Sequence, residues 1–383
     1  MRVVLASIGT RGDIQPILAA AQALRRRGHE ALVACPPSFA AWVRALGFEH
    51  RALGDDTLAR MAAQTERSSL GDVRRYLAER LPLQFPALVE LARGADAIVS
   101  TGMALGGTSA AEALGIPSLK LTLSTPPLPT AAHPPPVVPW RGLPGWINRL
   151  LWRLFGALQE RMMRPLVNAG RARIGLPPLA DLGRHLFTDT PTAVAADEEL
   201  LPPDPTWAPR FRYTGFLFLD DPAPLDPALD AWLRDGAPPV YVGFGSMEGP
   251  ARAAVVERLR RAIEETGRRC LVGREAPHHL LFPRVAAVVH HGGAGTTAAA
   301  LRAGVPQVVL PIALDQFHNA DALRRAGLAP PSPPFARVTP RSLQRALAGA
   351  LELPAAPRLR MAERVQRSDA GATLTAMVES LVI

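Results

Sequence analysis

One glycine-rich run, residues 290–297, constrains the fold of this chain more than any other stretch. It follows a short apolar run, 285–289, which indicates a buried strand. It precedes an alanine-rich run, 298–303, which is closed by Gly304, as helices commonly are. The sequence therefore predicts a strand that turns through glycines directly into the start of a helix.

This turn has the properties of an anion-binding site. Free N–H groups at a helix N-terminus and the helix dipole favour a negative ligand, and glycines let the backbone come close to it. Threonine hydroxyls and two histidines at the strand end supply further donors or positive charge. The run is neither a Walker loop nor the Rossmann G-x-G-x-x-G. We predict a diphosphate site formed by His290, His291, Gly293, Ala294, Gly295, Thr296 and Thr297.

Strands alternate with helices in both halves of the chain, which predicts an α/β fold with parallel sheets. A chain of 383 residues is too long for one ordinary core. We expect an N-terminal domain over 1–219, a C-terminal domain over 220–365 and a terminal helix over 366–383. The predicted strands are 3–8, 31–35, 97–100, 118–123, 240–244, 269–272, 285–289 and 307–310.

Composition argues against several classes of protein. The net charge is +9, but all but one of the 43 basic residues are arginines spread over most predicted helices, with Lys120 the exception. A nucleic-acid binder gathers its charge on one face, so no nucleic-acid partner is expected. No run of about 18 apolar residues indicates a transmembrane helix. Cys35 and Cys270 lie in predicted strands and are expected to be core residues, not a disulfide or metal site.

Two polar residues, Asp315 and Gln316, lie just past the strand predicted at 307–310. In open α/β sheets, ligands bind beyond the carboxyl ends of the strands. A carboxylate beside a carboxamide suits a sugar, whose hydroxyls need both acceptors and donors. The competing interpretation is that Asp315 caps a helix over 317–326, and the two roles are compatible.

Asp13 follows the first predicted strand and directly precedes a helix. One interpretation is an N-cap, and the other is a general base that points toward the boundary between the two halves. Position alone does not separate the two. Ser246 lies in the turn directly after the strand predicted at 240–244 and could donate to a phosphate.

A proline-rich loop over 126–145 leads into an apolar, arginine-flanked helix that contains Trp146, Trp152 and Phe155. Three arrangements suit such a helix. It could cover an acceptor site, lie on a membrane surface, or pack on its own domain. We therefore expect either a cytoplasmic protein or one that also touches the inner membrane surface.

These motifs, in this order, resemble those of the UDP-glycosyltransferase superfamily. The motifs are Gly12-Asp13, Gly243-Phe244-Gly245-Ser246, the run 290–297 and Asp315-Gln316. The chain is similar to the bacterial branch that glycosylates antibiotic and macrolide aglycones, and to the sterol glucosyltransferases. The resemblance implies the GT-B fold, in which two Rossmann-like domains face each other across a cleft. It also implies inversion at the sugar's anomeric carbon without a metal ion or other cofactor.

The resemblance also implies a role for each motif. Asp13 would deprotonate the acceptor hydroxyl, where many relatives have histidine. The run 290–297 and Ser246 would hold the diphosphate, and Asp315 and Gln316 would bind the donor sugar. The donor would be a UDP- or TDP-sugar, with UDP-glucose favoured. Trp146, Trp152 and Phe155 would contact a lipophilic acceptor such as a polyketide, macrolide, sterol or carotenoid. The protein would be a monomer or a homodimer.

One segment departs from the family pattern. Relatives usually have a longer stretch before the diphosphate turn, with one more strand and an aromatic residue, often tryptophan, that stacks on the donor's base. Here 272–278 closes that distance at once, and all six tryptophans, the last being Trp232, precede the strand at 240–244. Two alternatives therefore stay open: a nucleotide-sugar epimerase or hydrolase of the same fold, and a catalytically impaired partner of another glycosyltransferase.

Overall fold

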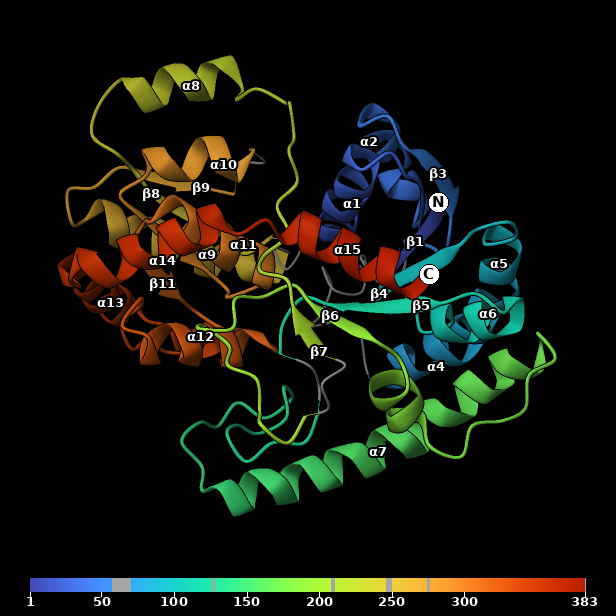
Figure 1. Cartoon of the computed structure of the whole chain (residues 1–383). Coiled ribbons are helices and arrows are strands. Elements are labelled where there is room, and N and C mark those ends of the chain that lie inside the picture. The colour runs from blue at the N-terminus through green and yellow to red at the C-terminus, as the bar shows by residue number, and fades with distance from the viewer. Residues whose placement is uncertain (57–69, 126–127, 208–210, 246–249, 274–275, 383) are drawn as a thin grey trace.

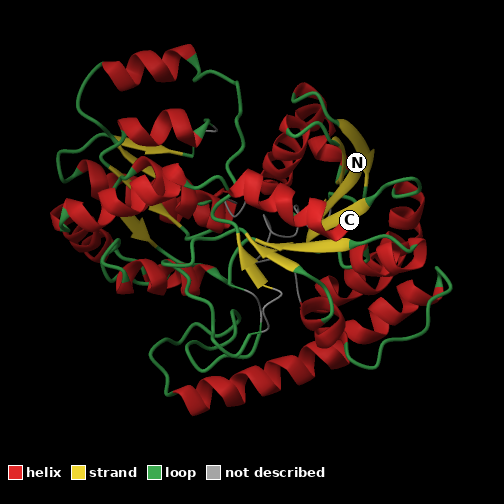
Figure 2. Ribbon diagram, in the orientation of Figure 1, coloured by secondary structure: helices red, strands yellow, loops and turns green. Residues whose placement is uncertain are grey.

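A computed structural model describes residues 1–56, 70–125, 128–207, 211–245, 250–273 and 276–382 of the chain. Two α/β halves lie side by side, each built around its own sheet (Figures 1 and 2). Every strand pairing in both sheets is parallel, as the alternation of strands and helices predicts.

The N-terminal half contains a sheet of seven strands in the order β3-β2-β1-β4-β5-β6-β7. Its strands are β1 (Arg2–Ile8), β2 (Glu30–Cys35), β3 (Glu49–Ala52), β4 (Ala97–Gly102), β5 (Ser118–Thr122), β6 (Thr192–Val194) and β7 (Phe211–Tyr213). Its helices are α1 (Arg11–Arg26), α2 (Ala40–Ala45), α4 (Leu70–Arg80), α5 (Gln84–Leu91), α6 (Gly107–Leu114) and α7 (Gly145–Ala172).

The C-terminal half contains a sheet of four strands in the order β11-β10-β8-β9. Its strands are β8 (Val240–Gly243), β9 (Cys270–Val272), β10 (Ala287–His290) and β11 (Gln307–Val309). Its helices are α8 (Pro227–Arg234), α9 (Pro250–Glu264), α10 (His278–Leu281), α11 (Ala294–Ala303), α12 (Gln316–Arg325), α13 (Pro340–Glu352), α14 (Ala355–Arg367) and α15 (Ala370–Val382).

The first strand shows why the N-terminal sheet is apolar throughout. In β1, Val3 and Leu5 join the core cluster that includes α1, while Val4 and Ile8 join a second cluster with α5 and α6. Helices thus cover both faces of the strand, so alternation of apolar and polar residues gives way to a continuous apolar run. The strand ends at Ile8, which brings the start of α1 to the carboxyl edge of the sheet.

The last helix, α15, lies against α1 of the N-terminal half (Figure 1). Leu374 and Val378 are fully buried in the core cluster that contains Ile14 and Leu18. A Cβ at Gly371 would lie 2.8 Å from Cβ of Ala23, so the two helices approach closely there because the residue is glycine. The C-terminal end of the chain therefore ties the two halves together.

Another apolar cluster, distinct from the two around β1, spans the boundary between the halves. It combines Val194 and Phe216 from the N-terminal half with Leu301 and Leu323 from the C-terminal half. Beside it, Nε of Arg364 in α14 donates to Oδ2 of Asp197 at 2.7 Å. The two halves are therefore packed against each other, and α1 and α11 are in contact.

Candidate active site

The predicted anion turn lies between β10 and α11. Gly292 has φ of +88°, and a Cβ there would lie 2.8 Å from Val309 and 3.1 Å from the carbonyl oxygen of Gln316, so both conformation and space require glycine. Gly293 is the N-cap of α11, and within the described residues no side chain caps it. The first intrahelical bond runs from the N–H of Thr297 to the carbonyl of Gly293. The preceding N–H groups of the helix therefore have no helical partner.

Among the described residues, the start of α11 is open at Gly295. Gly295 is exposed, and no described atom lies within 4 Å of where its Cβ would stand. Thr296 is half-buried, whereas Thr297 is buried, with a hydroxyl that has no partner among the described residues. Ser246, the other predicted phosphate contact, lies outside the described residues, as does Arg274.

Of the two roles that the sequence allows for the histidines of the turn, burial favours hydrogen bonding over positive charge, because it lowers the pKa of both imidazoles. His290 is fully buried, and its Nδ1 accepts a hydrogen bond from the N–H of Gly292 at 3.1 Å. Its Nε2 lies 3.0 Å from Oε1 of Gln307, and burial lowers the pKa of His290 to about 3. Burial likewise lowers the pKa of His291 to about 4. His290 thus stabilises the turn through hydrogen bonds to Gly292 and Gln307. His291 packs against Gly293, where a Cβ would lie 2.5 Å from Nε2 of His291.

One interpretation of the sequence makes Asp13 the N-cap of α1, and this is wrong, because the helix begins at Arg11 and Thr10 is its cap. The carboxylate of Asp13 instead accepts hydrogen bonds from the N–H of Thr10 at 2.7 Å and its hydroxyl at 3.1 Å, which forms a capping box. A Cβ at Gly9 would clash with this carboxylate, and one at Gly102 would lie 3.4 Å from Oδ1. Burial raises the pKa of Asp13. The ends of β1 and β4 therefore hold one carboxylate in a fixed position.

Asp315 takes the N-cap position of α12, but its side chain makes no capping bond within the described residues. The pKa of Asp315 is raised to about 6, mainly by burial and in part by the charge of Asp13. Leu314, just before it, has φ of +54°, which is a strained conformation for leucine. The two predicted carboxylates, one from each half of the chain, thus share one site.

Gln316, the first residue of α12, contacts the backbone just before Asp315. Its Oε1 accepts hydrogen bonds from the N–H groups of Ile312 at 2.9 Å and Ala313 at 3.0 Å. The side-chain carbonyl therefore holds the loop that carries Asp315 in shape.

Sequence reasoning missed Asn319, which links both parts of the site. Its Nδ2 donates to the carbonyl of Gly292 at 2.8 Å, and its side chain hydrogen-bonds Asp315. Asn319 lies one helical turn after Asp315 in α12, and that spacing is the signal that could have found it.

The proline-rich loop of the N-terminal half docks on α12. Nε of Arg141 donates to the carbonyl of Phe317 at 3.2 Å, and the ring of His133 lies 4.1 Å from that of His318. Trp152, which is 2% exposed, donates from Nε1 to the carbonyl of His133 at 2.9 Å. Trp152, which the sequence predicts to contact the acceptor substrate, is therefore buried under this loop and stabilises it. Of the other two, Trp146 is 63% exposed, and Phe155 is half-buried with its ring 5.7 Å from that of Trp152.

Two further findings concern metals and membranes. Within the described part of the chain, no group of three or more His, Cys, Asp or Glu side chains is placed so as to hold a metal ion. Among the helices of the described residues, none combines the length and apolar character needed to cross a bilayer.

Two parallel α/β halves, one with an open helix start and the other with a carboxylate held at the end of its first strand, are the architecture of a GT-B glycosyltransferase. Residues 3–129 match the glycosyltransferase family 28 N-terminal domain, and residues 265–377 match the C-terminal domain of the erythromycin biosynthesis protein CIII-like family. The chain belongs to this family of GT-B glycosyltransferases, which confirms the expected fold class and the resemblance. It is a glycosyltransferase that uses a nucleotide-sugar.

Three proteins similar to this chain are from Amycolatopsis orientalis. The chain is 38% identical to glycosyltransferase GtfE over 351 residues, covering 86% of this chain and 85% of the relative. It is 36% identical to vancomycin aglycone glucosyltransferase, with the same coverage of both chains. It is 34% identical to dTDP-epi-vancosaminyltransferase, covering 86% of this chain and 84% of that one. Among solved structures, spinosyn forosaminyltransferase SpnP shares the fold with a TM-score of 0.72 at 20% identity, over 100% of this chain and 99% of that one.

Proposed function

We propose that this protein is an inverting glycosyltransferase that moves a sugar from a nucleoside diphosphate to a hydroxyl of a lipophilic natural product, without a metal ion. The observation that carries the proposal is that Asp13 of one half acts electrostatically on Asp315 of the other, while Asn319 ties Asp315 to the turn before α11. Similarity to a vancomycin aglycone glucosyltransferase supports a natural-product acceptor. The same site would serve an antibiotic aglycone, a macrolide or a sterol.

Asp13 is the proposed general base. Burial raises its pKa toward the working range of a base, while the two hydrogen bonds from Thr10 fix its orientation. In the proposed step, Asp13 takes the proton of the acceptor hydroxyl as that oxygen bonds to the anomeric carbon. The bond between this carbon and the diphosphate oxygen breaks at the same time, so the configuration inverts.

The start of α11 is the proposed site for the leaving group. The electron pair of the breaking bond goes to the diphosphate, whose negative charge grows as the sugar departs. Preorganised N–H groups at Ala294, Gly295 and Thr296 would stabilise that charge without rearrangement. Because His290 and His291 are neutral, the N–H groups and the helix dipole carry this task, and the imidazoles contribute at most hydrogen bonds.

Asp315 is the proposed sugar contact, with Gln316 and Asn319 as positioning residues. A carboxylate with a pKa of about 6 is mostly ionised at pH 7 and accepts hydrogen bonds from sugar hydroxyls. Asn319 ties Asp315 to the carbonyl of Gly292, so the sugar and diphosphate contacts keep a constant spacing. Sugars held at that spacing would present the anomeric carbon toward Asp13.

The donor nucleotide is proposed to be UDP or TDP, with UDP-glucose as the first donor to test. The relatives include vancomycin aglycone glucosyltransferase and an enzyme named for a dTDP-sugar. Both nucleotides carry the same diphosphate, so the start of α11 alone does not distinguish them.

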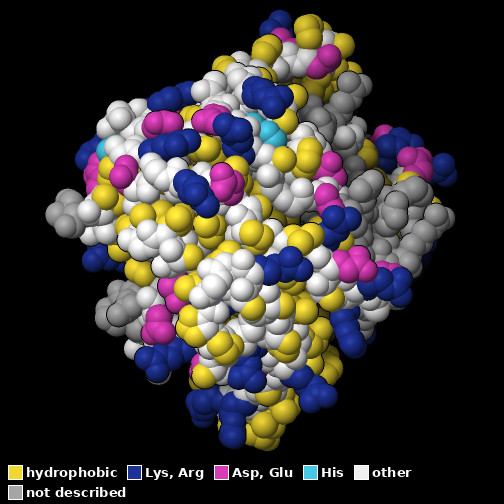
Figure 3. Space-filling view, turned by 90° about the vertical axis from the view of Figure 1, so that its right-hand side faces the viewer, with side chains coloured by type: hydrophobic (Ala, Val, Ile, Leu, Met, Phe, Trp, Pro, Cys, Tyr) yellow, Lys and Arg dark blue, Asp and Glu magenta, His cyan; other side chains and the backbone are white. Residues whose placement is uncertain are grey.

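The exposed face of α7 supports a lipophilic acceptor that reaches the enzyme from a membrane surface. Five large apolar side chains, four residues apart, are exposed along this helix: Trp146, Leu150, Leu154, Leu158 and Met162. Exposed arginines at 149 and 153 lie beside them. Figure 3 shows hydrophobic and basic side chains gathered at the lower end of the molecule, where α7 runs in Figure 1. This combination is typical of a helix that rests on an anionic lipid surface.

A mass-spectrometric screen tests the proposal. UDP- and TDP-glucose are each incubated with a panel of hydrophobic alcohols and phenols, with and without EDTA. Glycosylated product that forms equally well in EDTA supports metal-free transfer. Rapid release of free nucleotide without any glycosylated product would instead favour an epimerase or hydrolase.

A further inference from the structure

Exposed apolar side chains are found not only on α7 but also on the proline-rich loop before it, which is described over 128–144. In this loop, Val137 is 55% exposed and Trp140 is 63% exposed. On α7, Trp146, Leu150 and Leu154 are exposed and four residues apart, so they follow one face of the helix. We call these five side chains the α7–loop surface. A group of this kind on a folded protein indicates a contact with a partner.

The exposed charges beside this surface are positive. Arg149 and Arg153 are exposed and lie among the apolar residues of α7. Glu160 is the single acidic residue of the helix, and its Oε1 accepts hydrogen bonds from the N–H groups of Leu182 at 2.8 Å and Gly183 at 2.9 Å. Because this carboxylate binds its own chain, the exposed side of α7 carries a net positive charge.

An anionic lipid bilayer fits this surface better than a second copy of the chain. Two copies that paired through α7 would bring their exposed arginines together, and the one carboxylate of each helix is already bonded elsewhere. In a bilayer, acidic headgroups attract arginines while the boundary of the acyl chains takes up apolar side chains. Tryptophans such as Trp140 and Trp146 suit that boundary because one part of the ring is apolar and the N–H is polar.

The loop is held in place beside α7 by two buried side chains of that helix. Nδ2 of Asn148 donates to the carbonyl of Ala131 at 2.8 Å, and Nε1 of Trp152 donates to the carbonyl of His133 at 2.9 Å. In Figure 1 the loop lies between the start of α7 and α12. A bilayer that binds α7 therefore meets a loop whose position is set by the helix.

Arg141 connects the exposed part of the loop to the helix that carries the donor contacts. Its Nη1 donates to the carbonyl of Trp140 at 2.8 Å, and its Nε donates to the carbonyl of Phe317 in α12 at 3.2 Å. Phe317 stands between Asp315, the proposed sugar contact, and Asn319, which is bonded to the turn before α11. The loop thus joins the exposed Trp140 to the candidate active site through one guanidinium.

We propose that the α7–loop surface docks on an anionic lipid bilayer, and that this docking strengthens nucleotide binding by holding the loop against α12. A partner that binds one arrangement of a loop more tightly than the others shifts the population toward it. Val137 and Trp140 enter the bilayer beside α7 only while the loop lies along that helix, which is the arrangement in which Arg141 reaches Phe317. The effect on nucleotide binding rests on the proposed function, whereas the docking itself does not.

Co-sedimentation with lipid vesicles tests the docking on the wild-type protein. The probes are vesicles of phosphatidylcholine alone and vesicles in which part of the phosphatidylcholine is replaced by phosphatidylglycerol. We expect binding to the anionic vesicles to be about tenfold tighter or more, and to weaken as salt is added. Equal binding to both kinds of vesicle, or binding to neither, would overturn the proposal.

A charge-matched pair of variants tests which surface is used. Arg149→Gln combined with Arg153→Gln should weaken binding to the anionic vesicles about tenfold or more. Arg341→Gln combined with Arg345→Gln removes two exposed arginines of α13 and should bind like the wild type. All four side chains are solvent-exposed or on exposed helix surface, so both proteins should keep the wild-type melting temperature. Equal vesicle binding by the two variants, or a wild-type dimer that Leu150→Ser dissociates, would contradict docking of this surface on lipid.

Calorimetry with UDP tests the coupling to the candidate active site. Saturating anionic vesicles should raise the affinity of the wild type for UDP about fivefold or more, which is a typical size for coupling between two sites. Arg141→Met should still sediment with these vesicles but lose their effect on UDP affinity, whereas Arg341→Met should keep it. UDP affinity that vesicles do not change in the wild type would overturn the coupling.

The outcomes separate this inference from the proposed function. If the protein sediments with anionic vesicles but does not bind UDP, the docking stands and the proposed function does not. If the protein binds UDP and transfers sugar but ignores the vesicles, the proposed function stands and this inference does not.

Discussion

The charge of Asp13, on the first helix of the N-terminal half, raises the pKa of Asp315 on the other half of the molecule. The influence is secondary to burial, and together they raise this pKa to about 6; it indicates that the two carboxylates lie near each other across the two halves. Three hundred residues of chain separate them in sequence, and the packing of α15 on α1 helps to hold their halves together.

Replacing the proposed base should separate catalysis from binding. Asp13→Asn keeps an oxygen that can accept the bonds from Thr10, so the capping box and the fold should survive. We expect kcat to fall by about a hundredfold or more, the usual contribution of a positioned base. Calorimetry should show nearly unchanged UDP affinity. Turnover equal to that of the wild type would remove Asp13 from the mechanism.

Asp315→Asn should stabilise the protein while impairing it. The pKa of Asp315 is about 6 in the folded protein, whereas an aspartate in an unfolded chain has its ordinary pKa of 3.8, so ionisation opposes folding above these values. At pH 7.5 the variant should gain up to about 3 kcal/mol, since one pKa unit is worth about 1.4 kcal/mol. The gain should shrink as the pH falls toward 4. Urea unfolding at several pH values measures this, with exposed Asp235→Asn as the control. A gain that does not depend on pH would contradict the burial of an ionisable carboxylate.

Asp315→Ala should affect the sugar more than the nucleotide. If the carboxylate contacts sugar hydroxyls, the affinity for UDP-glucose should fall about tenfold, while that for free UDP should change little. Titration calorimetry compares the two ligands on the same protein. Equal losses for both would argue against a sugar contact.

Gly295→Ala should weaken nucleotide binding without harm to the fold. The added methyl enters open space over the N–H groups of α11, where the diphosphate is proposed to lie, and alanine is a better helix residue than glycine. We expect at least tenfold weaker binding of UDP, with a melting temperature that is unchanged or higher.

Gly156→Ala is the matched control for that change. Gly156 also lies in a helix, α7, with no described atom within 4 Å of its would-be Cβ. This variant should share the effect on stability and keep the wild-type affinity for UDP. Unchanged affinity in both variants would place the diphosphate elsewhere.

Two tryptophans of α7 should differ in their structural importance. Trp152 is buried and bonded to the carbonyl of His133, so Trp152→Ala should cost about 3 to 5 kcal/mol of unfolding free energy. Trp146 is 63% exposed, so Trp146→Ala should cost less than about 0.5 kcal/mol. Chemical denaturation of both variants gives the comparison. Similar losses would mean that Trp152 does not anchor the proline-rich loop.

Much of the fold could be predicted from the sequence because its long strands are buried on both faces. Runs such as Val3–Ile8 are apolar throughout, and glycines mark the turns that follow them. The strands β3 and β7 escaped prediction because they lie at the edges of the sheet and are largely exposed, so they show no buried apolar run. The buried strand β6 has only three residues, two of them small or polar.

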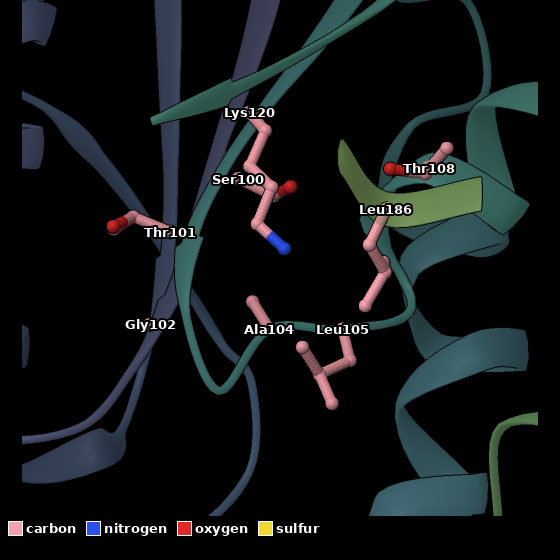
Figure 4. Close-up of a pocket in the computed structure, with 8 residues that line it drawn as sticks. All are labelled: Ser100, Thr101, Gly102, Ala104, Leu105, Thr108, Lys120 and Leu186. Atoms are coloured by element: carbon pink, nitrogen blue, oxygen red, sulfur yellow. The ribbon is translucent and has the colours of Figure 1, made fainter. Parts of the chain in front are cut away.

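The candidate active site, too, could be predicted only in part from the sequence. The turn at 290–297 is local in sequence, so its geometry could be predicted from glycines and neighbours. The protonation of His290 depends on burial by residues far along the chain, and the link from Asn319 to Gly292 depends on how α12 packs. Lys120 differs from the other basic residues in the sequence only in being the single lysine. The small pocket into which its side chain points (Figure 4) forms only where β4, β5 and the turn at 184–188 come together.

The most direct test of the account is a crystal structure of the protein with UDP or TDP bound. We predict diphosphate oxygens about 3 Å from the N–H groups of Ala294, Gly295 and Thr296, with the open face of the terminal phosphate toward Asp13. Nucleotide density at any other place, or a bound diphosphate on which Asp13 and Asp315 do not converge, would contradict it.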